Sequence, residues 1–313
     1  MAEPTSFSVV VLGEALIDRF PGRDVIGGAP FNVARNLALL GAAPLMITRI
    51  GSDALGDTVA ADFARFGMST RGLQRDPAHA TGTVAVHMQG TQHTFEIGAD
   101  SAWDHLDADE AVAVVRGGAP ALGYFGTLAQ RGPVSRAAIH AALDASNALP
   151  FLDLNLRDGP DNRALAESSL ARAEFVKVND DELEQLIDWF GAPREAAVIW
   201  GDAAHRTATA SLLARFGLRR LTITRGAAGW ACLDAAGEWL EGRAPAVTVR
   251  DTVGAGDAFA SVLLLGELRG WPLRTALERA AAHASAVCGI DGAVDPASGI
   301  YAAAQAAWEH TAV

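Results

Sequence analysis

Short apolar segments alternate with longer segments of helical periodicity through most of the chain, and this rhythm constrains the fold most. Buried strands are predicted at 7–12, 44–50, 122–125, 150–154, 175–178 and 221–224, and helices at 30–40, 55–66 and 203–216 and from Pro133, Asp161 and Asp180. From about residue 252 the pattern becomes helical, with helices predicted at 255–268, 272–288 and 298–310. Strands that alternate with helices of this length form βαβ units. We therefore expect an α/β fold with a doubly wound, mainly parallel sheet that is flanked by helices.

Two strand-like segments interrupt the alternation. Residues 14–27 contain short pieces marked by Gly and Pro, and residues 82–98 have the pattern of a β-hairpin around Gln89–Gly90. We expect them to form a small β lid over the carboxyl ends of the parallel strands, where ligands bind in open α/β sheets. Internal repeats and low-complexity linkers are absent, so residues 1–313 are predicted to form a single domain with two lid insertions.

The charge balance excludes some partners. Asp and Glu (37) outnumber Lys and Arg (25), which gives a formal charge of -12 over 313 residues. Nucleic acids and anionic membranes are polyanions, so neither is an expected partner. No apolar segment approaches the ~20 residues that span a bilayer, and the N-terminus lacks an export-signal pattern. We expect a cytoplasmic protein, and the two cysteines, Cys232 and Cys288, have no metal-binding spacing.

The segment DTVGAGDAF, residues 251–259, has the pattern of an anion site beside a carboxylate. Small residues at 254–256 let the backbone turn tightly and approach a ligand, and Asp257 is predicted to open an apolar helix. Backbone N–H groups at a helix N-terminus bind anions, and a carboxylate placed there could accept the proton of a substrate hydroxyl. An ordinary helix cap at Asp257 is the alternative from these residues alone.

The same segment resembles, residue for residue, the C-terminal signature of ribokinase-like (PfkB-type) carbohydrate kinases. Further matches, in the expected order, are GEALID at 13–18, GGAPFNVARNLALLG at 27–41, RIGSDALG at 49–56, VNDDE at 178–182 and TRGAAG at 224–229. The resemblance covers nearly the whole chain and is closest in pattern to fructokinases. It implies a ribokinase-like fold and an ATP-dependent kinase that phosphorylates a small sugar, most simply fructose.

The resemblance also implies roles for residues around the phosphates. Asp257 would deprotonate the acceptor hydroxyl, and the anion hole would be formed by Gly254, Ala255 and Gly256. Asn179 and Glu182 match an element that organises hydrated Mg²⁺ around ATP, which suits an ion that keeps several waters. From the residues alone, NDDE is equally a helix cap.

Further positions match the nucleotide and cation sites of the family. Thr224, Gly226 and Gly229 correspond to the segment along the nucleotide, although their glycines also fit a plain strand–turn–strand connection. Asp251 corresponds to a residue at a monovalent-cation (K⁺) site, and is otherwise a surface charge. His283 matches the adenine side weakly and also fits a partly buried helix histidine.

On the sugar side, Asp18, Gly28 and Asn32 match positions that hold sugar hydroxyls. Without the resemblance, Asn32 is an ordinary residue in the first turn of a helix and Asp18 an exposed lid residue. Arg157 ends DLNLR, an element similar to one in fructokinases and 2-keto-3-deoxygluconate kinases, and could reach a phosphate or a substrate carboxylate. The family often has Pro after this Arg, whereas Asp158 follows here.

Other classes fit the sequence less well. A dinucleotide-dependent oxidoreductase requires GxGxxG after the first strand, and a P-loop kinase requires GxxxxGK[ST]; neither pattern is present. A 2-keto-3-deoxygluconate kinase, another sugar or nucleoside kinase, and a non-catalytic sugar or nucleotide sensor stay open. A β lid with exposed edge strands favours a homodimer formed through the lid.

Overall fold

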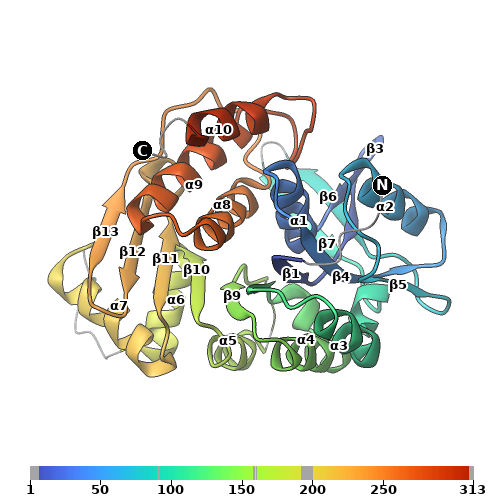
Figure 1. The fold of residues 1–313 in the computed structure, drawn as a ribbon, viewed down its shortest axis with the longest axis horizontal. Coiled ribbons are helices and arrows are strands. Elements are labelled where there is room, and N and C mark those ends of the chain that lie inside the picture. The colour runs from blue at the N-terminus through green and yellow to red at the C-terminus, as the bar shows by residue number, and fades with distance from the viewer. Residues whose placement is uncertain (1–6, 90–91, 158, 160, 192–199, 310–313) are drawn as a thin grey trace.

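A nine-stranded sheet forms the centre of the molecule in the computed structural model, which describes residues 7–89, 92–157, 159, 161–191 and 200–309 (Figure 1). The spatial order is β13 (Trp239–Gly242), β12 (Trp230–Asp234), β11 (Arg220–Thr224), β10 (Phe175–Asn179), β9 (Leu149–Asp153), β8 (Leu122–Phe125), β1 (Val9–Leu12), β4 (Pro44–Gly51) and β5 (Leu73–Asp76). All neighbours from β11 to β5 pair in parallel, and β12 is antiparallel to both β11 and β13. The predicted fold class, a doubly wound and mainly parallel sheet, is confirmed.

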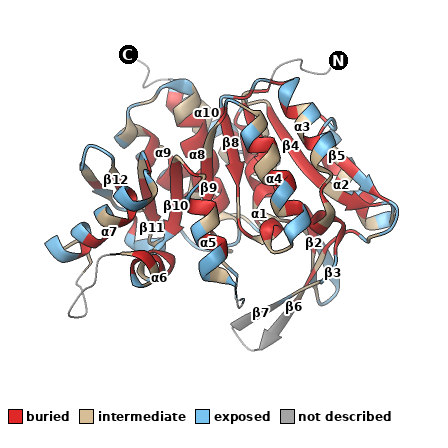
Figure 2. Ribbon diagram, turned by 90° about the horizontal axis from the view of Figure 1, so that it is seen from below, coloured by how far each residue is buried: buried red, intermediate tan, exposed pale blue. Residues whose placement is uncertain are grey.

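Helices cover both faces of this sheet. One layer contains α3 (Ala108–Arg116), α4 (Pro133–Ala145), α5 (Asn162–Leu170), α6 (Asp180–Phe190) and α7 (Ala203–Phe216). The other contains α1 (Ala29–Leu39), α2 (Ala54–Arg65), α8 (Ala255–Arg269), α9 (Leu273–Val287) and α10 (Ile300–Glu309). Val10 and Leu12 of β1 pack in the first core, and Val9 and Val11 pack in the second. Because both faces of each central strand are buried (Figure 2), these strands are continuous apolar runs.

A second, four-stranded sheet lies beside the first. Its order is β3 (Arg23–Gly27), β2 (Leu16–Phe20), β6 (Thr83–Gln89) and β7 (Gln92–Ile97). The parallel pairing of β2 with β6 joins the two segments that interrupt the βα rhythm, and β3 and β7 are the edges. The turn predicted around Gln89–Gly90 includes residues outside those that the structure describes.

The predicted elements agree with the structure to within about two residues at most ends, but β5, α3, β13 and the short 3-10 helices were missed, and β12 was predicted only as part of the strand–turn–strand alternative. Strand β5 (LQRD) carries three polar residues in four, and α3 is a short run of Ala, Val and charged residues, so neither shows clear periodicity. One boundary matters for the site: α8 begins at Ala255 with Gly254 as its N-cap, so Asp257 lies in the first turn and does not open the helix.

The remaining sequence expectations concern the membrane and the cysteines. Within the described ranges, the helices are too short or too polar to cross a bilayer. Both cysteines are free thiols, and Cys232 is buried in a core whereas Cys288 is only partly buried.

Candidate active site

A cavity of about 370 Å³ lies at the carboxyl ends of β9, β10 and β11, between the N-terminus of α8 and the four-stranded sheet. Ten predicted site residues line it: Asp18, Gly28, Asn32, Arg157, Asn179, Glu182, Thr224, Gly254, Gly256 and Asp257. The other four lie outside the lining: Ala255, Gly226, Gly229 and Asp251. Segments more than 200 residues apart in the sequence therefore meet at one place, the carboxyl edge of the sheet.

The turn into α8 brings backbone donors to this cavity. Gly254 has φ 78°, and a Cβ there would lie 2.4 Å from the Cβ of Ala293, so only glycine fits. The first N–H groups of a helix have no partner within the helix. The N–H of Ala255 donates to the carbonyl oxygen of Thr252 at 3.3 Å, which leaves the next two N–H groups, those of Gly256 and Asp257, as the better anion donors.

Asp257 is a buried carboxyl group with an unusual pKa. Its Oδ2 accepts a hydrogen bond of 2.7 Å from Nδ2 of Asn32, and the residue is 8% exposed. Burial raises the pKa of Asp257 to about 6 and the charge of Asp153 adds to this, although Asn32, Lys177 and Arg157 act to lower it. A carboxylate of this pKa is still ionised at neutral pH but is a stronger base than an exposed Asp.

A buried network fixes how Asn32 faces Asp257. Nη2 of Arg35 donates to Oδ1 of Asn32 at 2.5 Å, and Nη1 of Arg35 donates to Oδ2 of Asp62 at 3.0 Å. Because a guanidinium only donates, the amide oxygen of Asn32 must face Arg35 and its NH₂ group must face Asp257. Asp62 in turn neutralises Arg35, whose side chain is almost completely buried.

A second buried ion pair lies under Gly256. Nζ of Lys177 on β10 donates to Oδ1 of Asp153 on β9 at 2.8 Å, and the hydroxyl of Tyr124 donates to Oδ2 at 3.3 Å. Burial lowers the pKa of Lys177, but the charges of Asp153, Glu182 and Asp257 and the hydrogen bond to Asp153 outweigh it, so the pKa is raised. Lys177 therefore carries a positive charge at the cavity floor.

Asn179 and Glu182 form a capping box at the start of α6. Oδ1 of Asn179 accepts from the N–H of Glu182 at 2.7 Å, and Oε2 of Glu182 accepts from the N–H of Asn179 at 2.9 Å. Oε1 of Glu182 also accepts from the N–H of Leu156 at 2.8 Å. Burial raises the pKa of Glu182 above its ordinary value. The capping reading of NDDE is confirmed, and both residues still line the cavity.

The opposite wall contains acidic groups with fewer partners. Glu14 is 2% exposed, and its Oε2 has no hydrogen-bond partner among the described residues. Burial raises the pKa of Glu14 to about 7, although backbone hydrogen bonds from Glu14 and Ala29 and the charge of Arg157 act to lower it. Burial also raises the pKa of Asp18 to about 6, against the charge of Arg157. Gly28 has φ 102°, and a Cβ there would lie 2.6 Å from the carbonyl oxygen of Glu14, so a side chain would push into this wall.

Comparison with protein families decides the class. A family model described as "pfkB family carbohydrate kinase" matches residues 10–298. The chain belongs to this family.

Relatives and solved structures agree with that assignment. A fructokinase of Klebsiella pneumoniae is 30% identical over 272 residues, which cover 82% of this chain and 83% of the relative. The structure of a fructokinase with bound ATP from Xylella fastidiosa has a TM-score of 0.81 at 20% identity, covering 96% of this chain and 98% of that one. Aminoimidazole riboside kinase from Salmonella enterica has a TM-score of 0.73 at 24% identity, covering 91% and 94%. The likeness to these two structures shows a shared fold.

In this carbohydrate kinase, the four predicted residues outside the lining have structural roles or no close neighbour. Oδ1 and Oδ2 of Asp251 accept hydrogen bonds from the N–H groups of Val253 (3.0 Å) and Gly292 (3.1 Å), which tie two loops together. Gly229 has φ 102°, and a Cβ there would lie 2.1 Å from the carbonyl oxygen of Gly242. Gly226 starts the short 3-10 turn η3 (Gly226–Ala228) and faces open space. The strand–turn–strand reading of this segment is confirmed.

Four polar residues of the lining were not predicted: Glu14, Asp153, Asn155 and Lys177. Glu14 lies in the motif GEALID, and Asp153 and Asn155 lie in DLNLR. Lys177 interrupts an apolar strand, FVKVN. A lysine within a strand that is otherwise buried is a signal of a paired charge. His283, the weak adenine-side candidate, is 2% exposed, and its Nε2 lies 3.4 Å from Oδ1 of Asn36. It is a buried helix histidine outside the cavity lining.

Proposed function

We propose that this carbohydrate kinase transfers the γ-phosphoryl group of ATP to a hydroxyl of a small sugar, with Asp257 as the general base. The observation that carries the proposal is the position of Asp257, a buried carboxylate with a raised pKa in the first turn of α8, where the first backbone N–H groups of the helix lie. The acceptor hydroxyl gives its proton to Asp257 as its oxygen bonds to phosphorus, and the bond between phosphorus and ADP breaks. The N–H groups of Gly256 and Asp257 stabilise the charge on the transferred group.

The charges at the cavity floor support binding of ATP with Mg²⁺. Lys177 is a buried cation next to Gly256, which suits a site for phosphate oxygens. Asn179 and Glu182 would hold Mg²⁺ largely through water, because their oxygens already accept backbone hydrogen bonds and retain lone pairs. The ion would supply positive charge that neutralises the phosphates. Thr224, Gly226 and Gly229 would lie along the nucleotide, and Asp251 would contribute to a peripheral K⁺ site.

Fructose is the acceptor we propose. Carboxyl groups outnumber cations in the cavity lining. The carboxyl groups belong to Glu14, Asp18, Asp153, Glu182 and Asp257, and the cations are Arg157 and Lys177. Such a cavity suits a neutral polyhydroxy compound, whose hydroxyls donate to carboxylates. The relatives named fructokinase support the same choice.

The position of the Arg157 guanidinium in the cavity supports a second candidate acceptor. Its side chain lines the cavity, and its charge reaches Glu14, Asp18 and Asp257. A guanidinium there would bind the carboxylate of 2-keto-3-deoxygluconate in a bidentate manner. The excess of carboxyl groups around it favours fructose, because a sugar acid would be repelled by the other wall.

A screen for ADP release tests these proposals. Purified protein would be supplied with ATP and Mg²⁺ and with fructose, ribose, 2-keto-3-deoxygluconate, tagatose or adenosine, one at a time. We expect ADP only when an acceptor is present, and most with fructose. ADP release without an acceptor would contradict sugar phosphorylation, and its absence with every acceptor would favour a sugar or nucleotide sensor.

We also propose that residues 1–313 form one kinase domain whose segments 14–27 and 82–98 act as a lid, and that two lids join in a homodimer. The edge strands β3 and β7 of the four-stranded sheet leave backbone groups available for pairing. Light scattering after size exclusion measures the mass directly. A single-chain mass at micromolar concentration would rule out the dimer.

A further inference from the structure

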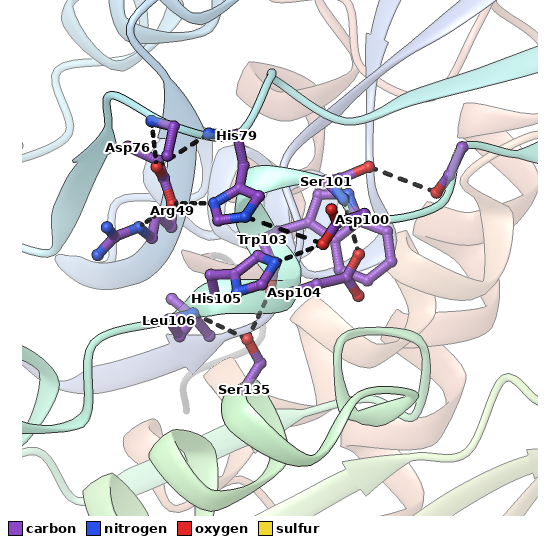
Figure 3. A network of polar contacts seen from close by, with 12 residues as sticks. Arg49, Asp76, His79, Asp100, Ser101, Trp103, Asp104, His105, Leu106 and Ser135 are labelled. Carbon is purple, nitrogen blue, oxygen red and sulfur yellow. Dashed lines mark hydrogen bonds and ion pairs between the residues drawn. The ribbon is translucent and has the colours of Figure 1, made fainter.

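Two histidines and an aspartate meet away from the cavity, at the base of the four-stranded sheet. Figure 3 shows His79, Asp100 and His105 pointing toward one another. One ligand atom from each lies within 4.8 Å of the other two. The pairs with Oδ1 of Asp100 are shorter, with Nε2 of His105 at 2.7 Å and Nε2 of His79 at 3.9 Å. We name this group the histidine cluster.

One nitrogen of His79 is held ready to bind a ligand. Its Nδ1 lies 3.0 Å from Oδ2 of Asp76, which is 2% exposed. Asp76 also accepts hydrogen bonds from the N–H groups of Ala78 and His79 and from Nε of Arg49, with which it forms an ion pair. A carboxylate that is paired with a guanidinium only accepts, so Nδ1 of His79 must donate and the lone pair of the neutral ring is on Nε2. Histidine ligands of metal ions are commonly oriented by a carboxylate in this way.

The other two side chains are free to adjust. The side chains of His105 and Asp100 are 29% and 73% exposed, so both can change rotamer without disturbing a core. The rings of His79 and His105 stack with centroids 3.6 Å apart and planes 11° apart. Two stacked rings cannot both direct a nitrogen at one ion, because an imidazole binds a metal in its own plane. Metal uptake therefore requires the exposed ring, that of His105, to rotate away from the stack.

We propose that the histidine cluster binds one Zn²⁺ ion through Nε2 of His79, Nε2 of His105 and a carboxylate oxygen of Asp100. Two imidazole nitrogens and a carboxylate suit Zn²⁺, whereas Mg²⁺ and Ca²⁺ prefer oxygen ligands alone. Zinc bonds of about 2.0–2.2 Å need ligand atoms roughly 3–3.5 Å apart. The present separations of 2.7 and 3.9 Å lie on either side of that range. The remaining coordination position faces solvent and takes water.

The position of the cluster gives the ion a structural role. His79 precedes β6 by four residues, and Asp100 follows the end of β7 by three. His105 ends the 3-10 helix η1 (Ala102–His105), which packs against the large sheet. A bound ion would therefore tie both connections of the β6–β7 hairpin to the body of the protein. Val84 of β6 and Ile97 of β7 line the cavity, so the ion would restrain one of its walls.

Metal titration of the untagged full chain tests the proposal. Protein stripped with a chelator, and free of nucleotide, would be titrated with Zn²⁺ against a chromogenic chelator and with Co²⁺ followed by visible absorption. We expect one tight equivalent of Zn²⁺ in the wild-type protein. His79→Gln, Asp100→Asn and His105→Gln should each weaken it by at least about tenfold, and Asp76→Asn should weaken it by about 10–100-fold through His79. His140→Gln, a matched change at a half-buried histidine of α4, should bind like the wild type.

Two measurements keep the result independent of folding. Thermal unfolding of the metal-free variants shows whether each is folded, and imidazole signals in the NMR spectrum of the wild type should shift for His79 and His105 when Zn²⁺ is added. A tight equivalent that survives in the double variant His79→Gln/His105→Gln would place zinc elsewhere and overturn the proposal. So would the lack of any tight equivalent in the wild type.

Discussion

The two walls of the cavity differ in how their charged groups are satisfied. On the wall built by α8, α6, β9 and β10, each carboxylate accepts hydrogen bonds from the protein: Asp257 from Asn32, Asp153 from Lys177, and Glu182 from two backbone N–H groups. On the wall built around β2, Oε2 of Glu14 is buried and, among the described residues, has no hydrogen-bond partner, although backbone N–H groups reach this carboxyl group. The carboxylate of Asp18 receives no hydrogen bond from the described residues.

This difference indicates which ligand groups each wall is suited to bind. Groups that are already hydrogen-bonded are fixed in position before a ligand arrives, which is what stabilisation of a developing charge requires. Buried polar groups without partners cost stability, and a ligand that supplies donors removes that cost. The partnered wall is therefore suited to chemistry and phosphate, and the unpartnered wall to the hydroxyls of the acceptor.

The largest expected effect comes from Asp257→Asn on the partnered wall. The amide is nearly isosteric but cannot accept the proton, so kcat should fall by roughly 10²–10⁴-fold while ATP binding is retained. Steady-state kinetics and a direct nucleotide-binding assay measure the two quantities. Asp109→Asn, at an exposed position of α3, is the control. Near-normal turnover of Asp257→Asn would remove the residue from the role of base.

Lys177→Met tests whether the pairing on this wall is essential to the fold. The change leaves the carboxylate of Asp153 buried without its cation, and we expect a loss of about 3–5 kcal/mol in the free energy of unfolding. Urea unfolding measures it, and adding Asp153→Asn should restore part of the loss. In the exposed pair of Arg172 with Asp144, Arg172→Met should cost no more than about 1 kcal/mol. Equal effects at the two pairs would contradict the buried-charge argument.

The sequence predicted the residues of the partnered wall better than the side-chain hydrogen bonds and ion pairs that connect them. Asp257, Asn32, Asn179 and Glu182 belong to contiguous motifs, and a contiguous motif keeps its local geometry wherever it lies in the fold. The link between Arg35 and Asp62, in contrast, joins α1 to α2 through side chains 27 positions apart. Neither a propensity nor a period encodes such a contact, because it depends on how the two helices pack.

The unpartnered wall was predicted in part, and for the same reason. Asp18 and Gly28 lie in motifs, whereas Glu14 follows a strand and looks like any exposed acid until the four-stranded sheet covers it. The sheet itself pairs β2 with β6 over some 65 residues, and the pairing register has no local signal. Burial, and with it a raised pKa, is a property of the assembled fold.

Asp18→Asn sharpens the role of the unpartnered wall. If Asp18 binds acceptor hydroxyls, loss of its charge should raise KM for the sugar by about 10–100-fold and leave KM for ATP nearly unchanged. Initial rates with each substrate varied in turn separate the two constants. Asp24→Asn on the neighbouring strand β3 is a matched change at an exposed carboxylate and should alter neither. A parallel rise in both constants would indicate a general disturbance of the lid sheet.

Glu14→Gln has the smallest expected effect, and its sign depends on pH. The pKa of Glu14 is about 7 in the folded protein and 4.5 for the ordinary group, so between these values the folded state binds more protons than the unfolded state. The contribution of Glu14 to the free energy of unfolding of the wild type therefore falls as pH rises from about 4.5 to 7. Above pH 7 this contribution does not return. Gln carries no such penalty, so Glu14→Gln should be more stable than the wild type by about 1–3 kcal/mol at pH 8 and nearly equal to it at pH 4. Urea unfolding at both pH values measures this, with the exposed Glu110→Gln as the control. A variant less stable than the wild type at pH 8 would mean that the backbone hydrogen bonds to the Glu14 carboxylate outweigh the cost of its burial, and that the two walls are alike.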